Sequence, residues 1–300
     1  MIRIGVDFGG TKIEAAALDG EGRFVARVRA ANPRDYEGSI EITRQVMLEA
    51  ERQCGVTVDR VGVGIPGSIS PTSGLSRNAN SFWLNDRPLP VDMERVVERR
   101  LRMRNDADCL IISEAADGAA AGARTAFGVI IGTGCGGGLY LNGAEWAGAG
   151  GYSGEWGHTP LPWRTPEEAA RPHACWCGRT DCLETWVSGT AFMEDYRSAT
   201  GKALEGPEII AAARSGDPAA ARVLDSYIDR LGRGLATVCD LLDPEVIVLG
   251  GGMSNIDEIY DRLPAVIGRH VFSDVFSTAV RRAAHGDSSG VRGAAWLWEA

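Results

Sequence analysis

Apolar side chains along the chain alternate between short continuous runs and longer stretches with helical spacing. The runs of strand length lie at residues 2–8, 13–18, 23–29, 60–67, 127–131, 136–141 and 245–249. Helical patterns occupy residues 36–54, 91–100, 109–117, 190–200, 206–215, 218–243 and 291–298. This order predicts an α/β fold in which mixed sheets pack against helices. The stripe along residues 218–243 is typical of a domain core rather than a coiled coil.

Two of the predicted strand pairs are joined by turns that carry very little side chain. Residues 2–8 run into Gly9-Gly10-Thr11-Lys12, and residues 127–131 run into Gly132-Thr133-Gly134-Cys135-Gly136. Such turns let backbone N–H groups gather around an anion, although a single one is more often only a hairpin. Two of them in one chain, with threonine at matching places, predict two halves that face a shared phosphate.

Length, composition and charge narrow the class of protein. The 300 residues are 44% apolar, which is enough for two domains with a cleft between them. The formal charge of −9 argues against nucleic acid as a partner, because duplex binding depends on cationic side chains. Neither a signal-peptide pattern nor a long apolar run is present in the sequence, so we expect no membrane contact and a cytoplasmic location.

The seven cysteines are unevenly distributed, and three of them cluster at Cys175, Cys177 and Cys182. In a reducing compartment such clustering favours a metal over disulfides. With His158 upstream, three thiolates and one imidazole would form a closed, structural Zn²⁺ site. The alternative is a set of free thiols. Metal binding would order the intervening segment, which has little periodicity of its own.

Several polar residues stand at places suited to a substrate. Asn78 and Asn80 lie in a polar loop, where amides could bind the hydroxyl groups of a ligand or simply form turns. A further short strand is predicted to end at residues 103–106, and Asp106 stands at its end, where a carboxylate could act on a substrate. The alternative is that Asp106 or Asp108 caps the helix that follows.

These motifs resemble those of the ROK sugar kinases. Residues 7–12 (Asp-Phe-Gly-Gly-Thr-Lys) and residues 131–134 (Ile-Gly-Thr-Gly) are similar to the two phosphate loops of that family. The resemblance covers essentially the whole chain and implies the actin-like ATPase (ribonuclease H-like) fold, with two α/β domains and a central cleft. The smaller domain would comprise residues 1–112 and 286–300. Residues 113–285 would form the larger domain with the zinc-binding loop.

The resemblance also implies a role for each motif residue. Asp106 would be the general base that accepts the proton of the acceptor hydroxyl, and Asp7 would help to hold Mg²⁺ near the phosphates. The sugar hydroxyls would be bound by Asn80, Asn105, Glu155, His158 and Glu184. ATP would be bound by Asp7, Gly9, Gly10, Thr11, Lys12, Gly132, Thr133, Gly134, Gly136, Gly251 and Gly252. The zinc ligands would be His158, Cys175, Cys177 and Cys182.

The expected activity is ATP-dependent phosphorylation of a free hexose. Residues 64–71, 78–84 and 129–135 look most like those of bacterial fructokinases, so D-fructose is the expected acceptor and fructose 6-phosphate the product. Glucose, mannose and N-acetylglucosamine are alternatives within the family. A different class is a sugar sensor, but the family's DNA-binding repressors carry a helix-turn-helix domain before the first glycine hairpin, and here that hairpin begins at residue 2. A homodimer is expected by resemblance.

Overall fold

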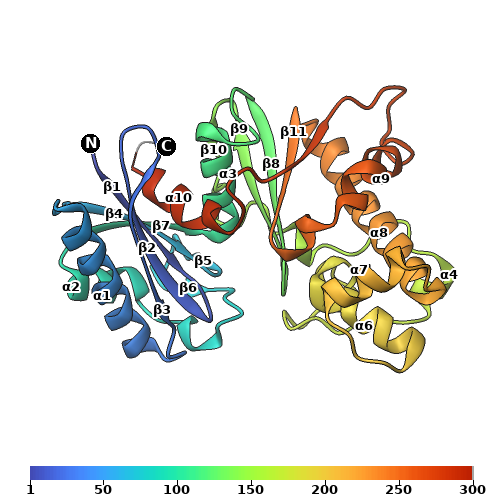
Figure 1. The fold of residues 1–300 in the computed structure, drawn as a ribbon, viewed down its shortest axis with the longest axis horizontal. Helices are drawn as coiled ribbons and strands as arrows, with labels where there is room; N and C mark the ends of the chain where they lie inside the picture. Colours follow the sequence, from blue (N-terminus) through green and yellow to red (C-terminus); the bar gives the residue numbers. More distant parts are fainter. Residues whose placement is uncertain (299–300) are drawn as a thin grey trace. The chain divides into compact units, whose positions relative to one another are not determined.

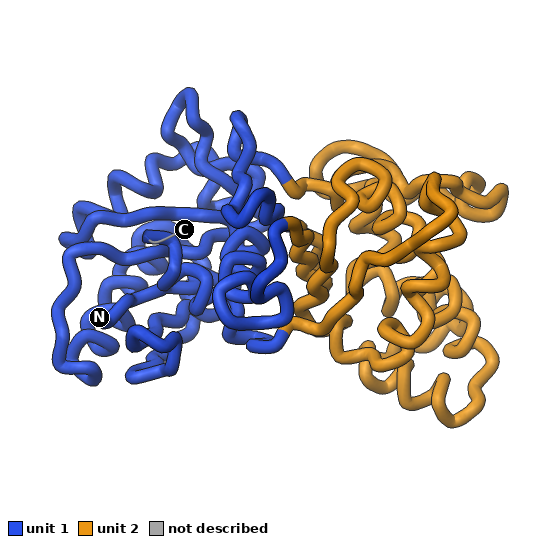
Figure 2. Tube along the Cα trace, turned by 90° about the horizontal axis from the view of Figure 1, so that it is seen from above, with its two compact units in different colours: residues 1–124, 138–153, 284–300 blue, residues 125–137, 154–283 orange. Residues whose placement is uncertain are grey.

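The computed structural model describes residues 1–298, and the chain divides into two compact units (Figures 1 and 2). Unit 1 contains residues 1–124, residues 138–153 and the C-terminal stretch from residue 284. Unit 2 contains residues 125–137 and 154–283. The domain boundaries expected from the family resemblance, near residues 112 and 286, stay a prediction. Among residues 1–298, no helix combines the length and the apolar character needed to cross a membrane.

Unit 1 is built on a five-stranded mixed sheet with the order β3-β2-β1-β4-β7. Its strands are β1 (Arg3–Phe8), β2 (Lys12–Leu18), β3 (Phe24–Ala31), β4 (Arg60–Ile65) and β7 (Arg100–Asn105). The first three strands pair antiparallel, and β1, β4 and β7 run parallel. Its helices are α1 (Tyr36–Cys54), α2 (Leu89–Val97), α3 (Asp106–Asp117) and α10 (Ser289–Trp296). The prediction of a mixed sheet packed with helices is confirmed.

The alternation of side chains along β1 determines which helix covers which face of this sheet. Val6 and Phe8 point to one face and join a buried apolar cluster with residues of α1. Gly5 points to the other face, where α10 approaches so closely that an added Cβ would lie 2.2 Å from the carbonyl oxygen of Val291. A Cβ at Gly62 of β4 would be closer still to α10. Glycine is therefore required where α10 packs.

Short elements complete unit 1. These elements are β5 (Ser68–Ile69), β6 (Ser76–Arg77), β10 (Ala144–Glu145), η1 (Phe82–Leu84) and η4 (Gly286–Ser288).

Two predicted helix ends in unit 1 need correction. The helix expected over residues 91–100 ends at Val97, because Glu98 adopts a left-handed conformation and Arg100 starts β7. The terminal helix likewise ends at Trp296 rather than Trp298.

The second sheet has the order β10-β9-β8-β11-β12. Its longer strands are β8 (Thr125–Ile131), β9 (Cys135–Leu141), β11 (Val246–Gly250) and β12 (Ala279–Arg282). Strands β8, β11 and β12 are parallel. The sequence pattern did not predict β12, whose Ala-Val-Arg-Arg sequence has no apolar run.

Helices of unit 2 pack around the longest of them, α8 (Pro218–Leu242). The others are α4 (Pro166–Ala169), α5 (Glu184–Val187), α6 (Gly189–Thr200), α7 (Gly206–Arg214) and α9 (Asp257–Gly268), with the turns η2 (Trp156–His158) and η3 (Gly252–Asn255). The stripe of α8 is buried against α6, α7 and α9, as Figure 1 shows. It therefore forms the core of unit 2. At Gly232 an added Cβ would lie 2.3 Å from Val266 of α9, so glycine permits this packing.

Candidate functional site

The first glycine turn (residues 8–12) joins β1 to β2 in unit 1. Gly9 must be glycine, because an added Cβ would lie 2.8 Å from the carbonyl oxygen of Lys12. Asn32, just beyond β3, donates its side-chain amide to the carbonyl of Gly9 (2.7 Å) and its backbone N–H to the carbonyl of Thr11 (3.0 Å). This turn is thus held by the neighbouring strand of its own sheet. Gly10 lies beside Ser81, whose hydroxyl would be 3.1 Å from an added Cβ.

Asp7 precedes this turn and carries a perturbed carboxyl group. Burial, followed by repulsion from Asp106 and Glu14, raises the pKa of Asp7 to about 7. Glu14 is its antiparallel partner on β2 and forms ion pairs with Arg27 and Arg29. A nearby cation would favour the ionised form of Asp7. A carboxylate with this surplus of negative charge fits a place near a hard cation such as Mg²⁺.

Asn105 and Asp106 stand where β7 passes into α3. The side-chain oxygen of Asn105 accepts a hydrogen bond from the N–H of Ala107 (2.9 Å), and its amide donates to the carbonyl of Gly67 (3.0 Å). Asn105 is therefore the N-cap, and Asp106 is the first residue of α3. The alternative in which Asp106 or Asp108 caps a helix starting near residue 109 is wrong, because α3 begins three residues earlier.

The carboxylate of Asp106 is desolvated. Burial raises its pKa, while hydrogen bonds from the N–H of Ala107 (2.8 Å) and from Asn105 act in the opposite direction. Both Asp7 and Asp106 thus lie in the same unit with raised pKa values. A carboxylate with a raised pKa is suited to accepting a proton.

The predicted sugar loop contains an unexpected support. Asn78 has a positive φ of 59°, which matches the turn-forming alternative for this residue. Asn80 is exposed. Between them, Ala79 is held by Asn85, whose side chain accepts from its N–H and donates to its carbonyl, both at 2.9 Å. Sequence analysis missed Asn85, although asparagine in a polar loop is the signal that could have identified it.

The second glycine turn (residues 131–136) joins β8 to β9 in unit 2. It is closed by a hydrogen bond from the N–H of Gly132 to the carbonyl of Gly134 (3.0 Å). The start of α6 holds its tip, because the N–H of Gly189 donates to the carbonyl of Gly132 (2.7 Å). The hydroxyl of Thr190 donates to the carbonyl of Thr133 (3.0 Å).

Two further segments hold the part of this turn that leads into β9. The N–H of Cys135 donates to Oε2 of Glu184 (2.9 Å), and the indole of Trp156 donates to the carbonyl of Gly136 (3.1 Å). A Cβ at Gly134 would lie 2.6 Å from the same Glu184 oxygen.

The glycine-rich loop after β11 packs on the strand that leads into the second glycine turn. Gly251 has a φ of +83°, and an added Cβ would lie 2.5 Å from the carbonyl of Ile131. Gly252 has no atom within 4 Å of an added Cβ. Only the first of these two glycines is therefore required by packing.

The four predicted zinc ligands come together in unit 2. The ligand atoms of His158, Cys175, Cys177 and Cys182 all lie within 4.8 Å of one another. Nδ1 of His158 is 3.6 Å from Sγ of Cys175, and the sulfurs of Cys177 and Cys182 are also 3.6 Å apart. A tetrahedral zinc site with ordinary Zn–S bonds has ligand separations of about 3.8 Å. Donor types and spacing therefore fit Zn²⁺.

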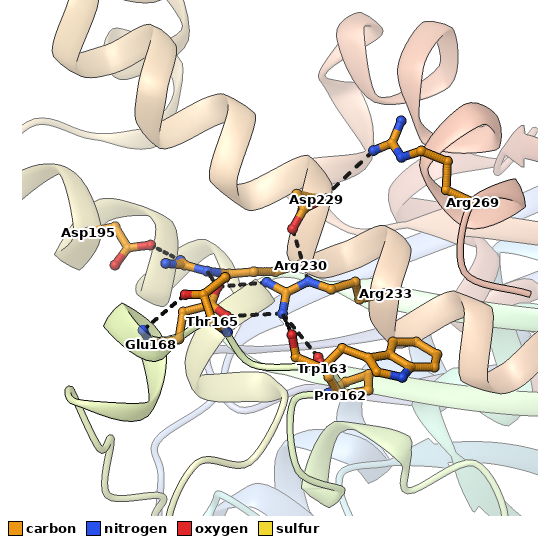
Figure 3. A network of polar contacts seen from close by, with 9 residues as sticks. All are labelled: Pro162, Trp163, Thr165, Glu168, Asp195, Asp229, Arg230, Arg233 and Arg269. Atoms are coloured by element: carbon orange, nitrogen blue, oxygen red, sulfur yellow. Dashed lines mark hydrogen bonds and ion pairs between the residues drawn. The ribbon is translucent and has the colours of Figure 1, made fainter.

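An ion-pair network supports the segment between these ligands (Figure 3). Glu168 and Thr165 form a capping box at the start of α4. The guanidinium of Arg233 on α8 binds both oxygens of Glu168 (2.6 and 3.0 Å), and Arg230 donates to the same carboxylate (2.9 Å). Burial raises the pKa of Glu168, but the hydrogen bonds from Arg233, Thr165 and Arg230 outweigh it and lower the pKa to about 2.

This network also stabilises the segment between His158 and Cys175, which metal binding alone was expected to order. Arg233 also donates to the carbonyls of Pro162 (3.0 Å) and Trp163 (2.9 Å). The sequence signal that could have revealed the capping box is Thr165-x-x-Glu168.

Residues 3–300 match the ROK family. The N-acetyl-D-glucosamine kinase of Yersinia pseudotuberculosis serotype O:1b is 37% identical over 297 residues, covering 98% of this chain and 97% of that protein. The ROK hexokinase from Thermus thermophilus has a TM-score of 0.85 at 31% identity and covers 98% of this chain and 97% of its own. A ROK family glucokinase from Streptomyces griseus, solved with glucose and AMPPNP, has a TM-score of 0.82 at 28% identity over 99% of each chain.

Proposed function

The chain belongs to the ROK family, and from this premise we propose that it transfers the γ-phosphoryl group of ATP to N-acetyl-D-glucosamine. It is a sugar kinase for a hexose-type acceptor, and the choice of acceptor rests on its similarity to N-acetyl-D-glucosamine kinases at 37% identity along 98% of the chain. This similarity is the observation that carries the proposal. The relatives give no support to fructose, which residues 64–71, 78–84 and 129–135 had suggested.

The chemistry assigned to unit 1 is proton transfer. Asp106 accepts the proton of the acceptor hydroxyl as that oxygen attacks phosphorus, and its raised pKa favours this step. Asn105 holds the start of α3, which keeps Asp106 in place. The N–H groups of each glycine turn are assigned to ATP phosphates. Mg²⁺, when bound with the help of Asp7, supplies neutralisation of the phosphate charge.

Sugar binding is assigned mainly to the segment that carries the cysteine cluster. Nδ1 of His158 faces Cys175, which leaves Nε2 as the ring nitrogen available for a sugar hydroxyl. Zn²⁺, when bound by His158, Cys175, Cys177 and Cys182, supplies structural order and fixes this tautomer. Glu155, Glu184, Asn80 and Asn105 remain proposed sugar ligands.

The test is ADP release by the purified protein with ATP, Mg²⁺ and one sugar at a time. We expect N-acetylglucosamine to give the highest kcat/KM when compared with glucose, mannose and fructose. A higher kcat/KM with fructose would reject the proposed acceptor and keep the kinase. No release with any of the four sugars, from zinc-loaded protein that binds N-acetylglucosamine in calorimetry, would identify a sensor. A homodimer and a cytoplasmic location stay predictions.

A further inference from the structure

The indole of Trp176 lies between two groups of the proposed sugar site. Trp176 stands in the chain between the ligands Cys175 and Cys177. Its Nε1–H donates to Oε1 of Glu184 at 2.7 Å. Its ring meets the imidazole of His158 edge-on, with centroids 5.0 Å apart and planes at 82°. One side chain thus touches a metal-ligating histidine and a carboxylate outside the ligand set.

Glu184 uses its two oxygens for two different partners. Oε1 accepts from Trp176, whereas Oε2 accepts from the backbone N–H of Cys135 in the second glycine turn. Hydrogen bonds to a carboxylate are stronger than those between neutral groups. Each oxygen accepts from one donor. The hydrogen bond from Trp176 therefore also keeps the carboxylate in the orientation that accepts from the N–H of Cys135. Gly134 leaves the space that this carboxylate occupies.

We propose that Trp176 is a positioning residue, and that the chain Trp176–Glu184–Cys135 connects the cysteine cluster to the second glycine turn. When the cluster is ordered, Trp176 holds Glu184, and Glu184 holds the N–H of Cys135. When the cluster loosens, Glu184 loses its indole donor and the glycine turn loses its support at Cys135. Metal occupancy thereby controls the order of a turn assigned to ATP phosphates. The last step rests on the proposed function, whereas the connection itself does not.

The test is amide hydrogen exchange in zinc-loaded full-length protein. Trp176→Phe keeps an aromatic ring beside His158 but removes the N–H donor. We expect exchange in residues 131–136 to rise about tenfold, as for loss of one charge-assisted hydrogen bond. Exchange in residues 8–12 should not change, because the first glycine turn is held by Asn32 in unit 1. Zinc content should stay at one per chain, since Trp176 supplies no ligand atom.

Trp163→Phe is the matched control. Trp163 belongs to the same segment and is exposed to a similar extent, 53% against 43% for Trp176, but its ring stacks on His270. Equal loosening of residues 131–136 in both variants would overturn the proposal, because it would indicate general disorder of the segment. Unchanged exchange there in Trp176→Phe would also overturn it.

Glu184→Gln gives an independent measurement if Trp176→Phe is poorly folded. Glutamine has a single acceptor oxygen and cannot serve both donors. Exchange in residues 131–136 should therefore rise in this variant too, and unchanged exchange would reject the connection.

A third measurement separates this inference from the proposed function. We expect AMPPNP to bind Trp176→Phe about tenfold more weakly than wild type, with KM for ATP raised more than kcat is lowered. If the wild-type protein phosphorylates no sugar, the proposed function fails while the exchange result still decides the connection. If AMPPNP affinity is unchanged although exchange rises, the link to ATP phosphates is rejected.

Discussion

The two glycine turns look alike in sequence but differ in what holds them. The first is supported by Asn32, which lies just beyond β3 of the same sheet. The second is held by Glu184, Trp156 and the start of α6, all of which follow it in the chain. A turn supported by its own sheet depends only on that sheet. A turn supported from outside inherits the stability of its supports, including the cysteine cluster.

The proposed proton transfer and most of the proposed sugar ligands also fall in different units. Unit 1 contains the two carboxylates with raised pKa values, Asp7 and Asp106. Unit 2 contains the cysteine cluster with Glu155, His158 and Glu184. Changes in the two units should therefore alter different measured quantities.

The largest expected effect is on turnover and comes from unit 1. Asp106→Asn should lower kcat about 10²- to 10⁴-fold, because it removes the general base. The sugar dissociation constant from calorimetry should change little. Asp59→Asn, an exposed aspartate in the same unit, is the control and should retain full turnover. Near-wild-type kcat in Asp106→Asn would reject its assignment as the base.

Of the two glycine turns, only the second should respond to removal of metal. Protein purified without chelator should contain about one zinc per chain, and chelation should increase exchange in residues 155–184 about a hundredfold, as expected for loss of a ligand present at 100 times its dissociation constant. Residues 131–136 should loosen with them, while residues 8–12 should not. Purified protein without zinc, or equal loosening of both turns, would contradict this comparison.

Breaking the ion-pair network should have a smaller effect, on the free energy of unfolding, and this effect should depend on pH. Glu168→Gln should lower the free energy of unfolding by about 2 kcal/mol at pH 7, because buried Arg233 loses its ion pair with Glu168 and keeps the one with Asp229. The pKa of Glu168 falls from 4.5 to about 2 in the folded protein. Its contribution to stability is therefore complete above pH 4.5 and disappears as pH falls towards 2.

Urea unfolding at several pH values measures this effect. Glu167→Gln, at an exposed neighbouring position, is the control and should match the wild type throughout. A difference between wild type and Glu168→Gln that stays constant from pH 7 to pH 3 would show that charge is not responsible.

The smallest effect is expected at the glycines after β11. Gly251→Ala should cost about 1 kcal/mol of stability, because φ is positive there and Ile131 leaves no room. Gly252→Ala should leave stability unchanged, because that position is open. Thermal unfolding of both variants and of the wild type measures this difference in stability. Any loss of AMPPNP affinity in Gly252→Ala would then be evidence for a direct contact with nucleotide.

Local patterns in the sequence were sufficient for most of the framework. Alternation along β1 and helical spacing along α8 both reflect burial of one face, which is a property of consecutive residues. The cysteine cluster could also be predicted, because thiols and a histidine at short spacing have few other uses in a reducing compartment. The likeness to the ROK kinases confirms the α/β fold.

Features that depend on distant residues could not be predicted. Glu168 and Arg233 form an ion pair although they lie 65 positions apart, and nothing in the sequence near either residue indicates the other as its partner. The start of α3 was misplaced because Asn105, Asp106 and Asp108 are all good caps, and packing decides between them. The expected acceptor, fructose, finds no support among the relatives, and its prediction was weak for the same reason, since several separate segments shape a sugar pocket.

The close packing of α10 on β1 and β4 has a consequence for synthesis of the chain. Gly5 and Gly62 leave space for a helix made of residues 289–296, so the first strands leave the ribosome long before their cover is translated. All the residues of unit 2 precede that helix in the chain. The core of unit 1 can therefore close only after all of unit 2 has been translated, and the sheet face that α10 covers stays exposed until residues 289–296 are made.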